Sequence, residues 1–217
     1  MKIIDWKLCL VADSEASERK NILSVIKEAT GEGVTLVQLR GKKLKTREFL
    51  DLALKASGFL RAKNIPLIIN DRVDIALSCN AAGVHLGQQD LPLLYARKIL
   101  GEKKLIGITI NTVKEAMVAE EGGADYLGAG PVFLTTTKEE LNPVLGLEGL
   151  RALKEKVKIP ILAIGGINPD NAGDVIATGV EGIAVVSAIL GAENVRKATR
   201  ELIEAIKTKL YENLLLV

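Results

Sequence analysis

Short apolar runs alternate with amphipathic segments along this chain of 217 residues. The apolar runs are bounded by turn residues, a pattern typical of buried strands in a parallel sheet. They predict strands at residues 8–12, 35–39, 66–69, 84–86, 105–109, 125–129, 159–164 and 182–186.

The segments between these runs have helical periodicity. We expect Thr46 and Asn168 to be helix N-caps, and Pro92 and Pro169 to lie in first helical turns. The periodicity predicts helices at residues 21–30, 46–63, 91–100, 112–121, 147–156 and 192–211, with a short helix after residue 71 and another from Pro169 toward Gly179.

Strand and helix thus alternate eight times with short connections, which favours a parallel sheet with right-handed crossovers. Eight units in a chain this short favour closure, so we predict an α/β protein with a (β/α)₈ TIM barrel as a single domain over residues 1–217. An open doubly wound sheet is the second interpretation. No GxGxxG motif follows the first strand, so a dinucleotide site has no support.

Composition and charge indicate how the core is built and argue against several kinds of partner and site. Aromatic residues are 3% against 48% hydrophobic residues, so Ile, Val, Leu and Ala must build the core. The net charge is +2 and no basic run with interleaved aromatics occurs, so we expect no nucleic-acid partner. We expect no membrane partner, because no apolar stretch reaches spanning length, and a cytoplasmic location, because the N-terminus lacks a signal-peptide pattern. Two cysteines without nearby histidines argue against a zinc site or disulfide framework.

Polar side chains and glycines follow nearly every predicted strand. In a barrel the carboxyl ends of all strands lie on one face, where ligands bind. Cations, hydroxyls, amides and carboxylates on that face are explained together by a phosphorylated small molecule with a metal ion. The residues concerned are Gln38, Arg40, Lys42, Asn70, Asp71, Asp90, Thr109, Thr135, Thr137, Lys138, Gly165, Gly166, Val186 and Ser187.

Asp71 and Asp90 follow the third and fourth strands. Two carboxylates at one rim, with few competing side chains, suit a hard cation such as Mg²⁺. The alternative is that both residues are helix N-caps, a common role for aspartate. By themselves, the two residues do not decide between these interpretations.

Five motifs occur in order along nearly the whole chain. They are VQLRGK at 37–42, INDR at 69–72, GVHLGQQD at 83–90, GAGPVF at 128–133 followed by TTTK at 135–138, and AIGGI at 163–167. Together they resemble the thiamin phosphate synthase family, although Thr109 stands where that family usually has serine.

The resemblance implies a transferase on a (β/α)₈ barrel. Such an enzyme joins 4-amino-5-hydroxymethyl-2-methylpyrimidine diphosphate to hydroxyethylthiazole phosphate, or to its carboxylated form. The products are thiamin phosphate and pyrophosphate, and the path is dissociative and Mg²⁺-assisted.

The resemblance also implies roles for individual residues. Arg40, Lys42 and Lys138 would be catalytic, and Asp71 and Asp90 would hold Mg²⁺. The pyrimidine diphosphate would be bound by Gln38, Arg40, Lys42, Asn70, Thr109 and Lys138. The thiazole phosphate would be bound by Thr135, Thr136, Thr137, Gly166, Val186 and Ser187.

Two other functions stay open at this point. One is a thiazole tautomerase-like isomerase, which needs a proton-transferring residue but no diphosphate site. The other is a non-catalytic sensor of phosphorylated ligands on the same barrel. We expect His85, Tyr126 and Trp6 to be structural, and the sequence leaves the oligomeric state open, with a homodimer as one option.

Overall fold

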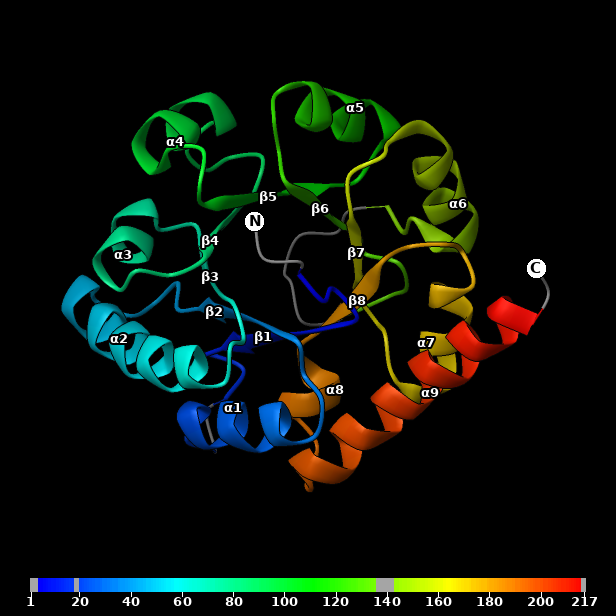
Figure 1. Cartoon of the computed structure of the whole chain (residues 1–217), viewed down its shortest axis with the longest axis horizontal. Coiled ribbons are helices and arrows are strands. Elements are labelled where there is room, and N and C mark those ends of the chain that lie inside the picture. Colours follow the sequence, from blue (N-terminus) through cyan, green and yellow to red (C-terminus); the bar gives the residue numbers. More distant parts are fainter. Residues whose placement is uncertain (1–3, 18–19, 136–142, 216–217) are drawn as a thin grey trace.

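The computed structural model describes residues 4–17, 20–135 and 143–215. Eight parallel strands pair in chain order, and the last pairs with the first, so the sheet is closed (Figure 1). The predicted TIM barrel is therefore confirmed, and the open doubly wound sheet is wrong. The strands are β1 Leu8–Asp13, β2 Leu36–Arg40, β3 Leu67–Asn70, β4 Gly83–Leu86, β5 Leu105–Ile110, β6 Tyr126–Ala129, β7 Ile161–Ile164 and β8 Gly182–Val185.

The helices surround the barrel (Figure 1). They are α1 Ile22–Gly31, α2 Thr46–Ala62, α3 Val73–Ser78, α4 Leu93–Leu100, α5 Val113–Glu121, α6 Gly146–Lys156, α7 Pro169–Ile176, α8 Ser187–Leu190 and α9 Val195–Leu215. Asn168 caps α7 as predicted, and its side chain accepts a hydrogen bond from the Asp170 amide. No helix in the described part of the chain is long and apolar enough to cross a membrane.

Two predicted helix starts are wrong. Thr46 is the first residue of α2 and Lys45 is its N-cap, because Glu48 accepts the Lys45 amide while the Thr46 hydroxyl accepts Arg72. Pro92 is the extended N-cap of α4 and does not lie in its first turn. The contacts of Glu48 and Arg72 account for the start of α2, and the extended ψ of 143° at Pro92 places that residue before the first turn of α4.

The last helix is also displaced from its prediction. It starts at Val195, because the Asn194 side chain accepts the Lys197 amide and so caps it there.

The core has two layers. Between strands and helices, apolar side chains such as Leu10, Leu39 and Ile69 are fully buried. Inside the barrel a smaller cluster contains Cys9, Val11, Leu36, Ile68, Tyr126, Leu162 and Ala184. Trp6 precedes β1 and packs against Tyr126, with ring centroids 5.0 Å apart, so the interior is filled below the site.

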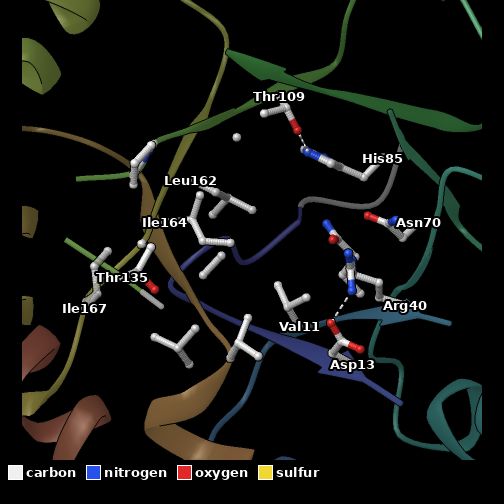
Figure 2. Close-up of a pocket in the computed structure, with 18 of the residues that line it drawn as sticks. Val11, Asp13, Arg40, Asn70, His85, Thr109, Thr135, Leu162, Ile164 and Ile167 are labelled. Carbon is white, nitrogen blue, oxygen red and sulfur yellow. Dashed lines mark hydrogen bonds and ion pairs between the residues drawn. The ribbon is translucent and has the colours of Figure 1, made fainter. Parts of the chain in front are cut away.

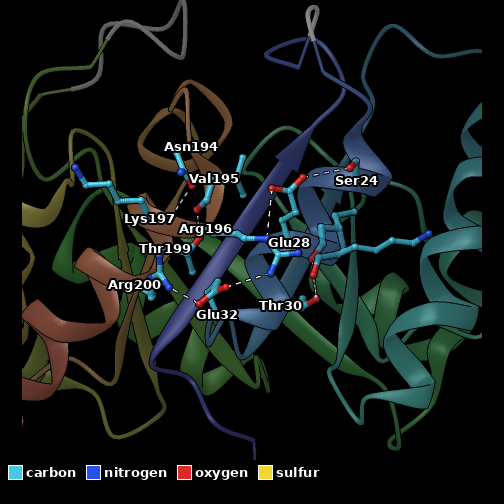
Figure 3. A network of polar contacts seen from close by, with 12 residues as sticks. Ser24, Glu28, Thr30, Glu32, Asn194, Val195, Arg196, Lys197, Thr199 and Arg200 are labelled. Atoms are coloured by element: carbon cyan, nitrogen blue, oxygen red, sulfur yellow. Dashed lines mark hydrogen bonds and ion pairs between the residues drawn. The ribbon is translucent and has the colours of Figure 1, made fainter.

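The first and last helices meet through a polar network (Figure 3). Arg196 of α9 pairs with Glu32 at 3.3 Å and with Glu28 at 3.9 Å, and Arg200 pairs with Glu32 at 3.8 Å. Exposed pairs of this kind contribute about 0–1 kcal/mol each. Burial of Leu202 and Ile206 is the larger reason that α9 packs against the barrel.

Candidate active site

A pocket of about 120 Å³ opens at the carboxyl ends of the strands. All eight strands contribute to its wall. Figure 2 shows Arg40, Asn70 and His85 on one side and the apolar Leu162 and Ile164 facing them. Nine residues predicted for this face line the pocket: Gln38, Arg40, Asn70, Thr109, Thr135, Gly165, Gly166, Val186 and Ser187.

Of the remaining predicted residues, some lie at a neighbouring part of the rim and others lie outside the described residues. Lys42 and Asp71 line a neighbouring hollow, which shares Asn70 with the main pocket. Asp90 interacts with Asp71 at the same rim. Thr136, Thr137 and Lys138 lie outside the described residues.

Asp71 and Asp90 form a carboxylate pair at the ends of β3 and β4. Burial, followed by the hydrogen bond and the charge of Asp90, raises the pKa of Asp71 from 3.8 to about 6. The Lys42 ammonium lies 3.7 Å from Asp71 Oδ2 and acts in the opposite direction. Asp90 is oriented by the Gly87 amide, which donates to its Oδ2 at 2.7 Å. The ionised form of Asp71 is therefore disfavoured, first by burial and then by Asp90.

Neither aspartate is a helix N-cap. Helix α3 begins at Val73 with Arg72 as its N-cap, and α4 has Pro92 in that position. Asp71 adopts a left-handed backbone with φ of 62°, and its amide donates to the His85 carbonyl at 2.9 Å. The capping alternative is therefore wrong, and the cation interpretation stays as the explanation for two adjacent carboxylates.

Arg40 ends β2 and has a partner that the sequence analysis did not identify. Its Nη1 donates to Oδ2 of Asp13, the last residue of β1, and the two residues are register partners. Asp13 Oδ1 accepts the Glu15 amide at 2.9 Å, so both carboxylate oxygens are used. Asp13 is 4% exposed, which makes this a largely buried ion pair. It holds the guanidinium at the pocket wall (Figure 2).

Two more residues of the wall were not predicted as site residues. Asn111, just beyond β5, donates through its side-chain amide to the Gly130 carbonyl. Tyr126 lies inside the barrel and accompanies His85 in the wall. The only available signal for Asn111 was its place after a strand, which it shares with many loop residues.

The opposite side of the pocket is formed by backbone. Gly165 and Gly166 follow β7 with φ of 104° and 68°, values that strain any other residue. A Cβ on Gly166 would lie 2.7 Å from Phe133 Cβ, so the turn also needs the missing side chain. Val186 and Ser187 lie beside this turn, since β7 and β8 pair. This is the position of the phosphate site in many TIM barrels.

The family model described as thiamine monophosphate synthase matches residues 8–189. A thiamine-phosphate synthase of Clostridium novyi is 48% identical over 199 residues, covering 92% of this chain and 98% of that protein. One from Clostridium acetobutylicum is 47% identical over 207 residues, with coverages of 95% and 98%.

The solved structures agree. Thiamine phosphate pyrophosphorylase from Pyrococcus furiosus superposes with a TM-score of 0.87 at 42% identity, covering 95% of this chain and 98% of that one. A 3-hexulose-6-phosphate synthase, at 20% identity and a TM-score of 0.68, shares the fold alone. The chain therefore belongs to the thiamine monophosphate synthase family and is a transferase of thiamine biosynthesis.

Proposed function

We propose that the enzyme joins 4-amino-5-hydroxymethyl-2-methylpyrimidine diphosphate to hydroxyethylthiazole phosphate and releases pyrophosphate. With the carboxylated form of the thiazole phosphate, carbon dioxide is released as well. The observation that carries this proposal is the convergence of Arg40, Lys42 and the Asp71–Asp90 pair at one rim, beside an apolar cavity. The cations and carboxylates at the rim suit a diphosphate with its metal ion, and the apolar cavity suits an aromatic ring. The isomerase and sensor alternatives are not favoured, since neither uses a diphosphate site.

The diphosphate end of the substrate is assigned to the cations. Arg40 can hold phosphate oxygens with two parallel hydrogen bonds, whereas Lys42 acts as a point charge. Lys138 would add a third charge, but it lies outside the described residues. These groups act when the carbon–oxygen bond breaks, because they stabilise the negative charge that collects on the departing diphosphate.

The carboxylate pair is assigned to Mg²⁺. Two adjacent oxygen ligands and the raised pKa of Asp71, caused by burial and by Asp90, fit a site that a divalent cation would neutralise. Across residues 4–17, 20–135 and 143–215, no group of three or more acidic, histidine or cysteine side chains could hold a metal. Water and the diphosphate would complete the coordination, and the ion would neutralise charge on the leaving group.

The pyrimidine ring is assigned to the pocket interior, with Gln38, Asn70 and Thr109 as its polar contacts. An aminopyrimidine can donate electrons to a cation at the carbon that loses diphosphate. Leu162 and Ile164 bring apolar surface to this cavity and exclude water that would compete for that cation. The thiazole nitrogen then forms the new bond and has no proton to lose, so the step needs no general base.

The thiazole phosphate is assigned to the opposite wall. Gly166, Val186 and Ser187 offer backbone amides there, and Thr135 offers a hydroxyl. Thr136 and Thr137 belong to this assignment but lie outside the described residues. The cytoplasmic location and the oligomeric state also stay predictions.

The test is an assay of pyrophosphate release by the purified chain with both substrates and Mg²⁺. Release that requires both substrates, together with thiamin phosphate in equal amount, is expected. Release with the pyrimidine diphosphate alone would indicate a hydrolase. A complete lack of release under these conditions would overturn the proposal.

We predict that Ser187→Asp raises KM for the thiazole phosphate by about tenfold or more, because a carboxylate would face a phosphate at the rim. Ser187 is exposed, so the fold should tolerate the change. Initial rates measured against each substrate in turn provide the test. The matched control is Ser187→Ala, which keeps the backbone amides and should change KM little. Equal KM values for Ser187→Asp and the original enzyme would remove β8 from the phosphate site.

A further inference from the structure

A row of hydrogen-bonded side chains forms the floor of the pocket. His85 Nδ1 lies 3.0 Å from the Tyr126 hydroxyl, and His85 Nε2 lies 2.9 Å from Thr109 Oγ1 (Figure 2 shows the latter contact). The rings of His85 and Tyr126 are 5.4 Å apart. His85 is 8% exposed and Tyr126 is 1% exposed, so both rings are buried, whereas Thr109 is half-buried.

The neighbouring strands leave space for these rings. A Cβ on Gly107 would lie 2.1 Å from Tyr126 Cζ, and one on Gly128 would lie 2.7 Å from His85 Cε1. Both distances are far below van der Waals contact. Any other residue at either position would displace a ring. The glycines of β5 and β6 are therefore required for the His85 and Tyr126 rings to occupy these positions.

The direction of the hydrogen bonds follows from the partners. Burial raises the pKa of Tyr126 well above its ordinary value, so the phenol keeps its proton, while a hydrogen bond with Gln38 acts in the opposite direction. If the Gln38 amide donates to the phenol oxygen, the phenol proton is free to be donated to His85 Nδ1. The neutral imidazole then carries its proton on Nε2 and donates it to Thr109 Oγ1.

With the hydrogen bonds in this direction, the Thr109 hydroxyl can donate its proton into the pocket. Thr109 Oγ1 accepts from His85, so its own proton is available, and Thr109 lines the cavity. Within the part of the chain that the structure describes, His85 is the only side chain that hydrogen-bonds this hydroxyl. All four groups then donate in the same direction, an arrangement in which each bond strengthens the next.

We propose that His85 is a positioning residue, which Tyr126 holds in the Nε2–H form and which fixes the Thr109 hydroxyl as a hydrogen-bond donor to the pyrimidine diphosphate. This inference rests on the proposed function, because it assumes that Thr109 faces that substrate. A preorganised donor requires no reorientation when the substrate arrives, and it selects a substrate with an acceptor at that point.

The chain offers a direct spectroscopic test, because His85 is its single histidine. In the full chain labelled with ¹⁵N-histidine, every imidazole signal belongs to His85 without assignment work. The expected two-bond ¹H–¹⁵N spectrum has an unprotonated Nδ1 and a protonated Nε2. A protonated Nδ1, alone or with Nε2, would overturn the proposal.

Tyr126→Phe removes the group that donates to Nδ1 and keeps the ring in its space. The expected spectrum is a mixture of the two neutral tautomers. An unchanged spectrum would show that Tyr126 does not set the tautomer, which contradicts the proposal. This arm needs no substrate, so it remains informative even if the proposed function fails in the pyrophosphate assay.

Kinetics test the link to Thr109. His85→Leu should lower kcat/KM for the pyrimidine diphosphate by about 10- to 100-fold and leave KM for the thiazole phosphate within about twofold. His85→Gln, which keeps an amide donor, should recover most of the loss. Thr109→Val should cost as much as His85→Leu, and the double variant no more than either alone.

If His85 had a structural role alone, the result would differ. His85→Leu would then lower the melting temperature and impair the use of both substrates equally, and its effect would add to that of Thr109→Val. That result would overturn the proposal. The control for removing a threonine hydroxyl is Thr30→Val in α1, whose hydroxyl donates to the Ile26 and Lys27 carbonyls. This control should keep both KM values.

Discussion

Asp71→Asn is expected to shift the Mg²⁺ dependence of pyrophosphate release to higher concentrations and to lower the rate at limiting Mg²⁺. The substitution removes one negative charge and one strong oxygen ligand from the pair with Asp90. The loss of metal affinity should at least equal the roughly 10- to 100-fold that outer-shell substitutions cost in metal sites. The measurement is a Mg²⁺ titration of the rate for Asp71→Asn, Asp90→Asn and the original enzyme.

The same substitution should stabilise the protein when no divalent ion is present. The pKa of Asp71 is raised from 3.8 to about 6, first by burial and then by Asp90. The folded state therefore binds the proton more tightly than the unfolded chain. The free energy of unfolding falls as the pH rises from about 4 to about 6 and stays lower above that range.

Asparagine does not titrate, so the free energy of unfolding of the Asp71→Asn protein does not fall in this way as the pH rises. At pH 7 the Asp71→Asn protein should exceed the original by at most about 3 kcal/mol in the free energy of unfolding, and the difference should disappear below about pH 4. Denaturant unfolding with a chelator, at pH 4 and pH 7, measures this. Activity and stability thus change in opposite directions, which a variant that merely misfolds cannot do.

Asp51→Asn on the exposed face of α2 is the control for the change of charge. It should leave both the Mg²⁺ dependence and the pH dependence of stability as they are. If Asp71→Asn and Asp90→Asn both keep the original Mg²⁺ dependence, the two carboxylates do not hold the ion and the metal leaves the proposed mechanism.

The sequence predicted the barrel well because a parallel sheet leaves a simple pattern. Apolar runs such as 159–164 need no alternation when both faces are buried, and the polar residue after each run must lie at the carboxyl end of its strand. This is why Arg40, Asn70 and Thr109 were placed at one rim correctly. Their roles in binding stay predictions.

The interior of the barrel was harder to predict for the same reason. All four residues of β4 are buried, so nothing in the pattern distinguishes His85, which points inward, from its neighbours. The pairing of Asp13 with Arg40 depends on strand register, which barrel closure determines and local sequence does not. Thr46 is not the predicted N-cap, because Glu48 and Arg72 form the contacts at the start of α2. Pro92, predicted in a first turn, precedes it as the N-cap of α4.

Arg40→Lys is expected to lower kcat/KM for the pyrimidine diphosphate by about 10²- to 10³-fold. The guanidinium donates to Asp13 and still has N–H groups directed to the pocket, whereas an ammonium on a flexible stem cannot keep both contacts in a fixed plane. Because positive charge is retained, ground-state attraction to the diphosphate should persist. The loss should therefore appear mainly in kcat, when the leaving diphosphate gains charge.

The measurement is single-turnover release of pyrophosphate together with binding of pyrophosphate and Mg²⁺ by calorimetry. Arg196→Lys is the matched control, since that side chain is 57% exposed on α9 and pairs with Glu32 away from the pocket. It should keep kcat and KM. In the Arg40→Lys background, Asp13→Asn should cost little more activity, because Asp13 acts by holding the guanidinium that is already gone. A large further loss would mean that Asp13 contacts the substrate itself, and a kcat unchanged in Arg40→Lys would remove Arg40 from the stabilisation of the leaving group.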